Sequence, residues 1–105
     1  MKIGVSTWLW TSPFTTDTIG LFQKIKSMGY DAVEIPVEYP EQIHGRTVYS
    51  ALRDNGLEPV VCGAFGTSRD LTNEDPAVHE NCFNYIAQCF ELCNEWNAKF
   101  LAGPM

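Results

Sequence analysis

Ile3-Gly4-Val5-Ser6-Thr7-Trp8-Leu9-Trp10, near the start of the chain, gives the strongest indication of its fold class. Its first six residues alternate in character and are rich in strand formers, which predicts a strand over residues 3–8. A dinucleotide-binding sheet would need a glycine-rich turn directly after such a strand. The residues that follow are bulky and aromatic instead, so the pattern favours a closed β/α barrel over a Rossmann-type sheet.

The rest of the chain repeats an alternation of strands and helices. Three more apolar, β-rich runs predict strands over residues 31–36, 59–64 and 99–103. Pro36 is expected to mark the end of the second strand, because proline cannot donate a backbone hydrogen bond. Strands that alternate with helices indicate parallel β-α units rather than an antiparallel sheet.

Three helices are predicted between these strands from their caps and their apolar faces. Their expected limits are a Thr15 or Thr16 cap to Gly29, an uncertain start near Gly45 to Asn55-Gly56, and Asp75-Pro76 to about Asn97. Their expected buried faces are Ile19, Phe22, Ile25 and Met28 in the first, Val48, Ala51 and Leu52 in the second, and Val78, Cys82, Ile86, Cys89, Phe90, Cys93 and Trp96 in the third.

These elements amount to three and a half β-α units with four parallel strands. Four strands cannot close a barrel, and an open parallel sheet of this size leaves two bare edges. We therefore expect residues 1–105 to be the N-terminal part of a single TIM (β/α)8 barrel domain. Part of the chemistry is then expected to lie on sequence outside these residues.

Composition is that of a folded globular piece, with 45% hydrophobic and 19% charged residues. The formal net charge of −6 opposes nucleic-acid binding, which needs clustered Lys and Arg. No apolar run approaches the roughly 20 residues of a membrane span, so no membrane partner is expected. The chain enters a strand directly after Met1-Lys2, which predicts no signal peptide and a cytoplasmic location.

The cysteines are expected to be reduced and structural. Cys82, Cys89 and Cys93 share one predicted helix, and the i, i+4 pair has poor geometry for a disulfide. A metal site that joins His79 to Cys82 is an alternative, but the cysteines continue an apolar stripe and free Cys packs as a small hydrophobe. We therefore expect no metal bound by this chain's own residues.

Candidate site residues follow the strands, because barrel chemistry sits at the C-terminal ends of strands. Glu34, late in the second strand, is the strongest candidate, since a carboxylate inside a barrel is costly without a partner, a metal or a sugar hydroxyl. An ion pair with a Lys or Arg from the part of the barrel outside these residues is the alternative role for Glu34, and Glu38 is expected to be a solvated loop charge. Trp8 and Trp10 form either a platform for a sugar ring or ordinary packing, and Phe65 follows the third strand.

Several motifs in order resemble the opening of the ketose 3-epimerases, the D-tagatose and D-psicose (allulose) 3-epimerases of the xylose-isomerase-like TIM-barrel superfamily. The motifs are Met1-Lys2-x-Gly4 with aromatics to Trp10, Gly29-Tyr30-Asp31-x-Val33-Glu34, Asp54-Asn55-Gly56-Leu57, Gly63, Asp75-Pro76 and Phe100-Leu101-Ala102-Gly103. Sugar-phosphate isomerases, inosose dehydratases and hydroxypyruvate isomerases have similar openings. The acidic charge disfavours the DNA-repair endonuclease branch of the superfamily.

The resemblance implies a sugar epimerase that depends on a divalent metal, Mn²⁺, Mg²⁺ or Co²⁺, and moves a proton at C3 of a ketose through an enediolate. It implies that the metal ligands and the acid/base pair, two Glu, one Asp and one His, lie on later strands. None of those positions falls within residues 1–105, so no catalytic residue is assigned here.

The resemblance instead gives this chain part of the wall of the substrate pocket. Glu34 matches a strand-two glutamate, Phe14 an aromatic of the first loop, and Pro104 lies near a small strand-four residue. Ser6 stands where the family has an aromatic on strand one, which leaves the sugar preference open, with Trp8 as a possible substitute. Together with Phe65, these are the expected substrate-binding residues.

Two functions from different classes remain. The first is the N-terminal part of a metal-dependent ketose epimerase or isomerase, inactive as residues 1–105 alone. The second is a half-barrel that pairs with another copy to hide its edges and serves as a non-catalytic binding or structural module. Self-association is expected of the isolated chain in either case.

Overall fold

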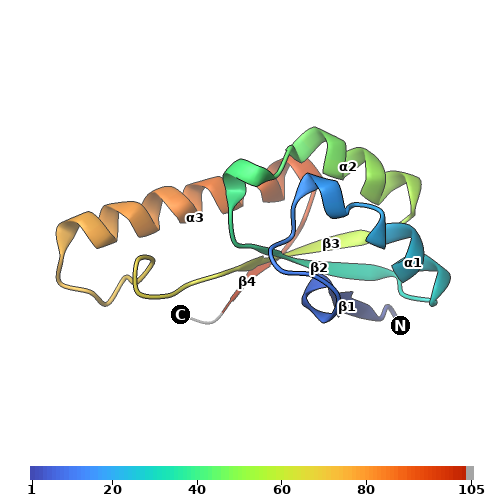
Figure 1. Cartoon of the computed structure of the whole chain (residues 1–105), viewed down its shortest axis with the longest axis horizontal. Coiled ribbons are helices and arrows are strands. Elements are labelled where there is room, and N and C mark those ends of the chain that lie inside the picture. Colours follow the sequence, from blue (N-terminus) through green and yellow to red (C-terminus); the bar gives the residue numbers. More distant parts are fainter. Residues whose placement is uncertain (104–105) are drawn as a thin grey trace.

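The sheet of this protein has four parallel strands in the order β1-β2-β3-β4, as the computed structural model of residues 1–103 shows (Figure 1). The strands are β1 (Gly4–Ser6), β2 (Ala32–Val37), β3 (Glu58–Gly63) and β4 (Leu101–Ala102). Neighbours along the chain are neighbours in the sheet, and every pair is parallel. The predicted α/β class and parallel sheet are confirmed.

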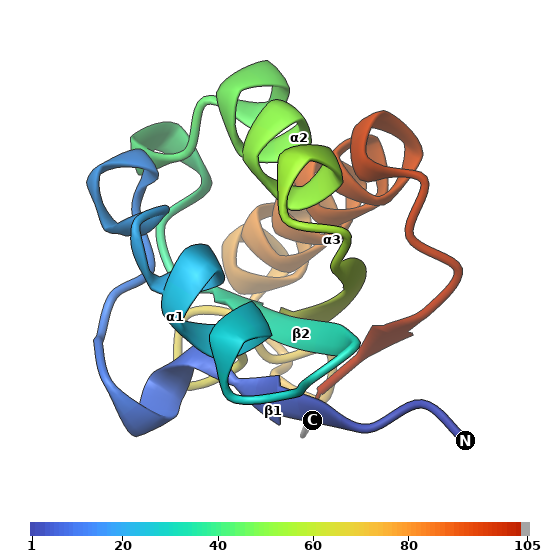
Figure 2. The ribbon, with the colours of Figure 1, turned by 90° about the vertical axis from the view of Figure 1, so that its right-hand side faces the viewer.

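Helices connect the strands and lie on the same side of the sheet (Figures 1 and 2). The α-helices are α1 (Leu21–Ser27), α2 (Gly45–Asp54) and α3 (Pro76–Trp96), and short 3₁₀ turns are η1 (Thr7–Leu9), η2 (Thr16–Thr18) and η3 (Pro40–Gln42). Parallel strands need crossover connections of this kind. The loop after β3 and the first turns of α3 project beyond the C-terminal ends of the strands (Figure 1).

The first strand is shorter than predicted and ends at Ser6. The Ser6 hydroxyl accepts a hydrogen bond from the Trp8 amide at 3.2 Å and so begins η1, which turns the chain out of the sheet. Pro36, in contrast, does not end β2, which continues to Val37. The pairing with β1 has already stopped at Glu34, so the missing N–H of Pro36 costs nothing on that side.

The helix caps agree with the sequence at α3 and differ at α1. Asp75 caps α3 through its carboxylate, which accepts from the Ala77 amide at 2.9 Å, with Pro76 at the first position. Thr15 caps the short η2 instead of α1, whose N-cap is Gly20. Gly29, at φ 95°, ends α1 as predicted.

The core lies between the sheet and the helices. Val33, Ile35 and Val37 alternate along β2, are fully buried, and belong to one hydrophobic cluster with Phe22 and Ile25 of α1. Burial of each such side chain stabilises the fold by about 1.5–3 kcal/mol. The indole of Trp96 donates to the Gly45 carbonyl at 2.9 Å and fastens α3 to α2.

The prediction of burial is wrong for two residues. Met28 and Phe90 are 55% and 54% exposed, because Met28 lies past the end of α1 and Phe90 sits one residue away from the buried face of α3. That face consists of Cys82, Tyr85, Cys89, Leu92, Cys93 and Trp96. The three helical cysteines are therefore core residues, as predicted.

The opposite face of the sheet carries no helix among the described residues (Figure 2). Side chains alternate along a strand, so the residues between the buried ones on β2, Ala32 and Glu34, point to this open face. The open face corresponds to the inside of a barrel, where a closed structure would bring further strands.

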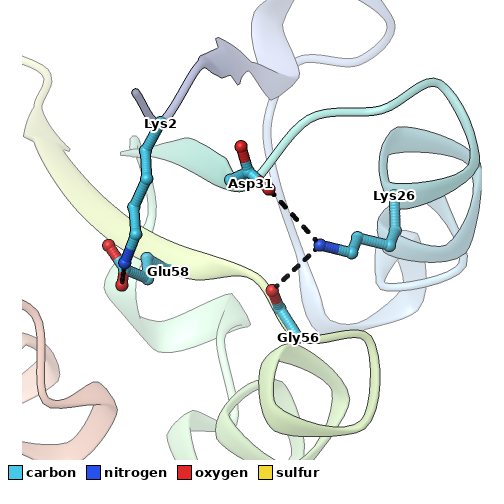
Figure 3. A network of polar contacts seen from close by, with 5 residues as sticks. All are labelled: Lys2, Lys26, Asp31, Gly56 and Glu58. Carbon is cyan, nitrogen blue, oxygen red and sulfur yellow. Dashed lines mark hydrogen bonds and ion pairs between the residues drawn. The ribbon is translucent and has the colours of Figure 1, made fainter.

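Ion pairs occupy the N-terminal end of the sheet (Figure 3). Lys2 pairs with Glu58 across the sheet, and the Lys26 ammonium lies 3.6 Å from the Asp31 carboxylate and 3.5 Å from the Gly56 carbonyl. These side chains are solvent-exposed, so each pair contributes little to stability. In a β/α barrel this end supports the fold, whereas chemistry belongs to the other end.

Candidate functional site

Ser6 and Glu34 occupy neighbouring positions on the open face of the sheet. They are register partners across β1 and β2, one at the last residue of β1 and the other midway along β2. A shallow hollow of about 280 Å³ lies against them, lined by Gly4, Val5, Ser6, Ala32, Val33, Glu34 and Val60. Because most of these side chains are small, the face leaves room for a ligand beside one hydroxyl and one carboxylate.

The Glu34 carboxylate has no cationic partner in the part of the chain that the structure describes. The ion pairs of residues 1–103 are those of Lys2 and Lys26, both at the other end of the sheet. Cys62 of β3 lies on the same face, and burial together with the negative charge of Glu34 raises the pKa of its thiol. Glu34 is therefore a half-buried acceptor that faces the open side.

Glu38 lies just after β2, at the C-terminal end of the open face, which we call the mouth, and it links the segments that meet there. Its Oε1 atom accepts hydrogen bonds from the Trp8 indole and from the Ser12 hydroxyl, both at 2.7 Å. Both donors belong to the connection between β1 and α1, so the carboxylate ties that loop to the end of β2. Glu38 is a partly exposed loop residue, as expected, but its carboxylate also accepts from two side chains, which the sequence did not predict.

Arg69 and Tyr85 make a second set of contacts beside Glu38. The Arg69 guanidinium donates to the Glu38 carbonyl at 2.7 Å and to the Ala64 carbonyl at 3.0 Å. It also lies 3.8 Å from the centre of the Tyr85 ring, within cation–π range. The Tyr85 hydroxyl donates to the Val37 carbonyl and accepts from the Ala64 amide at 2.7 Å.

Phe65 lies at this mouth, in contact with Tyr85. The two rings meet edge to face with their centres 5.6 Å apart. A hollow of about 300 Å³ opens here, lined by Glu38, Tyr39, Ala64, Phe65, Gly66, Thr67, Ser68 and Arg69. Gly63 is needed beneath Phe65, because a Cβ atom at that position would come within 2.6 Å of the Phe65 ring.

The structure thus divides the expected site residues into groups. Ser6 and Glu34 share the open face, and Trp8 and Phe65 lie at the mouth, with Trp8 44% exposed in η1 rather than at a strand end. Phe14 has no accessible surface and stacks on Phe22 at 5.8 Å, so it supports the first loop from inside the core. Pro104 lies outside the described residues.

The residues 1–103 do not bring together three or more His, Cys, Asp or Glu side chains in a way that could hold a metal ion. His79 and Cys82 lie on α3, and Cys82 is fully buried in the core. The donor set of this part of the chain therefore does not fit a divalent metal. Within the same residues, no helix has the length and apolar character to cross a membrane.

Sequence reasoning missed Arg69, Tyr85 and the contacts of Glu38. Tyr85 carried a usable signal, since it falls three residues after Cys82 and four before Cys89 on the same apolar stripe. Arg69 and Glu38 carried none, because their contacts join residues 31 positions apart in the chain.

Comparison with known proteins finds that this chain is similar to ketose 3-epimerases both in sequence and in fold. The chain is 35% identical over 104 residues to the ketose 3-epimerase of Arthrobacter globiformis, and 27% identical over 104 residues to the probable ketose 3-epimerase of Synechocystis sp.. These matches cover 98% and 99% of the chain but 36% of each relative. The chain therefore spans about a third of the length of the curated relatives it matches. No protein-family profile matches it.

The fold is that of the corresponding part of an epimerase barrel. The D-allulose 3-epimerase from Methylomonas sp., solved in complex with D-allulose, superposes with a TM-score of 0.89 at 18% identity. The match covers 98% of this chain and 36% of that one. The sheet and helices described above are thus similar to the N-terminal part of a TIM-barrel epimerase.

Proposed function

We propose that residues 1–105 are the N-terminal part of one ketose 3-epimerase barrel and supply a wall of its sugar pocket. The observation that carries the proposal is the position of Ser6 and Glu34 as register partners on a sheet face that no helix within residues 1–103 covers. The similarity to ketose 3-epimerases over nearly the whole chain supports it independently.

Each side chain of the proposed wall has a role that its chemistry allows. The Glu34 carboxylate accepts hydrogen bonds from sugar hydroxyls, and a charge-assisted bond of this kind is worth about 1.5–3 kcal/mol. Trp8 and Phe65 offer aromatic faces to the C–H surface of a sugar at the mouth. The Ser6 hydroxyl is a smaller donor and acceptor beside Glu34.

The chemical step is assigned to the remainder of the complete enzyme. We propose a C3 epimerisation through an enediolate with a divalent metal, as the resemblance to the family implies. The described residues offer no donor set for that metal, so no step through it is assigned to this chain. The role of this chain is to bind and orient the sugar.

The experiment is a hybrid enzyme. Residues 1–103 of this chain replace the matching N-terminal part of the Arthrobacter globiformis ketose 3-epimerase, and the interconversion of D-fructose and D-allulose is measured. Turnover by a hybrid that melts cooperatively supports the proposal. A folded hybrid that converts no ketose contradicts it.

Self-association is a further proposal for the isolated chain. The open sheet face and the outer edges of β1 and β4 are uncovered in the described residues. Unpaired strand edges and exposed apolar surface favour contact with a second copy. Such pairing would serve the alternative role of a half-barrel module.

A further inference from the structure

Arg69 links the loop after β2 to the loop after β3 through its guanidinium group. Its guanidinium donates to the Glu38 carbonyl after β2 and to the Ala64 carbonyl after β3. A tight turn holds Arg69 itself in place, with its amide donating to the Gly66 carbonyl at 2.9 Å. The planar, forked shape of Arg suits contact with two acceptors at once, which Lys cannot reproduce.

Tyr85, on α3, contacts the same two loops from the helix side of the sheet. Its hydroxyl bridges the Val37 carbonyl and the Ala64 amide, and its ring carries the Arg69 guanidinium at 3.8 Å. Tyr85 is only 3% exposed, and burial raises the pKa of its hydroxyl, so the phenol stays neutral and able to donate. Arg69 and Tyr85 together fix the chain after β2 and after β3.

Both aromatic residues of the mouth depend on this arrangement. Phe65 packs edge to face on Tyr85, and Trp8 bonds to the carboxylate of Glu38, whose carbonyl accepts from Arg69. A continuous set of contacts therefore runs from Trp8 through Glu38, Arg69 and Tyr85 to Phe65.

We propose that Arg69 is a positioning residue that fixes Trp8 and Phe65 relative to each other and so sets which ketose the mouth accepts. This inference rests on the proposed function of the site. Arg69 acts through its neighbours, since its two terminal nitrogens donate to backbone carbonyls and its cationic face is on Tyr85.

The first test measures the contacts in the chain itself. The three tryptophans give three indole N–H signals in an ¹⁵N-labelled chain, and Trp8→Phe identifies one of them. Arg69→Met is expected to shift or broaden the Trp8 signal and to leave the Trp96 signal in place, because Trp96 bonds to the distant Gly45 carbonyl. An unchanged Trp8 signal overturns the inference.

Arg53 provides a matched control. It lies over the Tyr49 ring at 5.8 Å, a second Arg–Tyr pair that borders the opposite end of the sheet. Arg53→Met is expected to leave the Trp8 signal where it is. Loss of the Trp96 signal in Arg69→Met would show that this variant is unfolded. In that case the Trp8 signal of Arg69→Lys is the test of the inference. The Lys variant keeps the charge but not the fork, so it must still move Trp8, and an unmoved Trp8 signal contradicts the inference.

The second test measures selectivity in the hybrid enzyme. D-fructose and D-tagatose differ in configuration at C4, so a loosened mouth should change the ratio of their KM values more than it changes kcat. Displacement of a binding group by about 1 Å can cost up to about 10²-fold, which sets the largest change expected. A ratio equal to that of the Arg53→Met hybrid overturns the inference. A wild-type hybrid without any turnover counts against the proposed function instead, and the indole measurement then stands alone.

Discussion

Ser6 and Glu34 are register partners on β1 and β2, and both side chains belong to the open face of the sheet. One is a small hydroxyl and the other a carboxylate without a cationic partner in residues 1–103. The pair gives this face its polar chemistry, and the small neighbours Gly4 and Ala32 keep the space beside it open.

Replacing Ser6 should change sugar preference, and loss of the Ser6 cap of η1 should lower the stability by about 0.5–2 kcal/mol. Ser6→Tyr places an aromatic ring in the hollow of about 280 Å³ beside Glu34, at the position where the resemblance to the family implies an aromatic. In the hybrid enzyme, we expect the ratio of D-fructose to D-tagatose turnover to change. Ser27→Tyr, on the exposed side of α1, is the matched control. A hybrid whose sugar ratio equals that of the control would remove Ser6 from the pocket wall.

Thr7 offers a test of packing at the end of β1. Its side chain is fully buried, and its hydroxyl has no hydrogen-bond partner within the described residues. A buried hydroxyl left unpaired costs about 1–3 kcal/mol. We therefore expect Thr7→Val, which is nearly isosteric, to hold or raise the free energy of unfolding in urea. A loss of more than about 1 kcal/mol would show that the hydroxyl has a partner in solution.

The buried cysteines should react slowly. Burial raises the pKa of the Cys82, Cys89 and Cys93 thiols above the ordinary 9.0. Thiol reagents should label them at the rate of unfolding, and at once in denaturant. Rapid labelling of all three in the folded chain would place them outside the core.

The same raised pKa values predict that the free energy of unfolding falls at alkaline pH. A folded-state pKa above the unfolded value means that the unfolded thiols ionise first as the pH rises through 9.0. The native state keeps its full stability below that pH and loses it as the pH approaches the folded pKa values. Urea midpoints between pH 7 and pH 10 measure the loss, and a midpoint that rises over this range would contradict the assignment.

The isolated chain should self-associate and should not turn over ketoses. Within residues 1–103 the outer edges of β1 and β4 are uncovered, and Phe83, Phe90 and Phe100 are each more than half exposed. Sedimentation at several concentrations should show a dimer or larger species. A dilute, stable monomer would contradict the proposed self-association. Turnover of D-fructose by the chain alone would contradict the assignment of the chemical step to the remainder of the complete enzyme.

The sequence predicts most of the regular elements because their signals are local. Asp75-Pro76 predicts the start of α3, and the apolar, β-rich run over residues 31–36 predicts most of β2. Gly29 ends α1 at a positive φ that few other residues adopt. The element boundaries that were predicted wrongly depend on single side chains, such as the Ser6 hydroxyl at the end of β1.

The site is predictable only in part, for a physical reason. Glu34 is visible from sequence because a carboxylate inside an apolar strand needs an explanation. The role of Glu38 depends on Trp8 and Arg69, which lie 30 and 31 residues away, and no local pattern encodes such contacts. The resemblance to the family gave Phe14 as a pocket residue, yet its ring is in the core.

The most direct test of the account is the Glu34→Gln substitution in the hybrid enzyme, with KM for D-fructose and the melting temperature measured on the same samples. Loss of a charge-assisted hydrogen bond of about 1.5–3 kcal/mol predicts a KM raised about ten- to a hundredfold, with the melting temperature unchanged. Glu91→Gln, on the exposed side of α3, is the matched control and should change neither value. An unchanged KM together with a large fall in melting temperature would make Glu34 a structural residue and would contradict the claim that this face of the sheet binds the sugar.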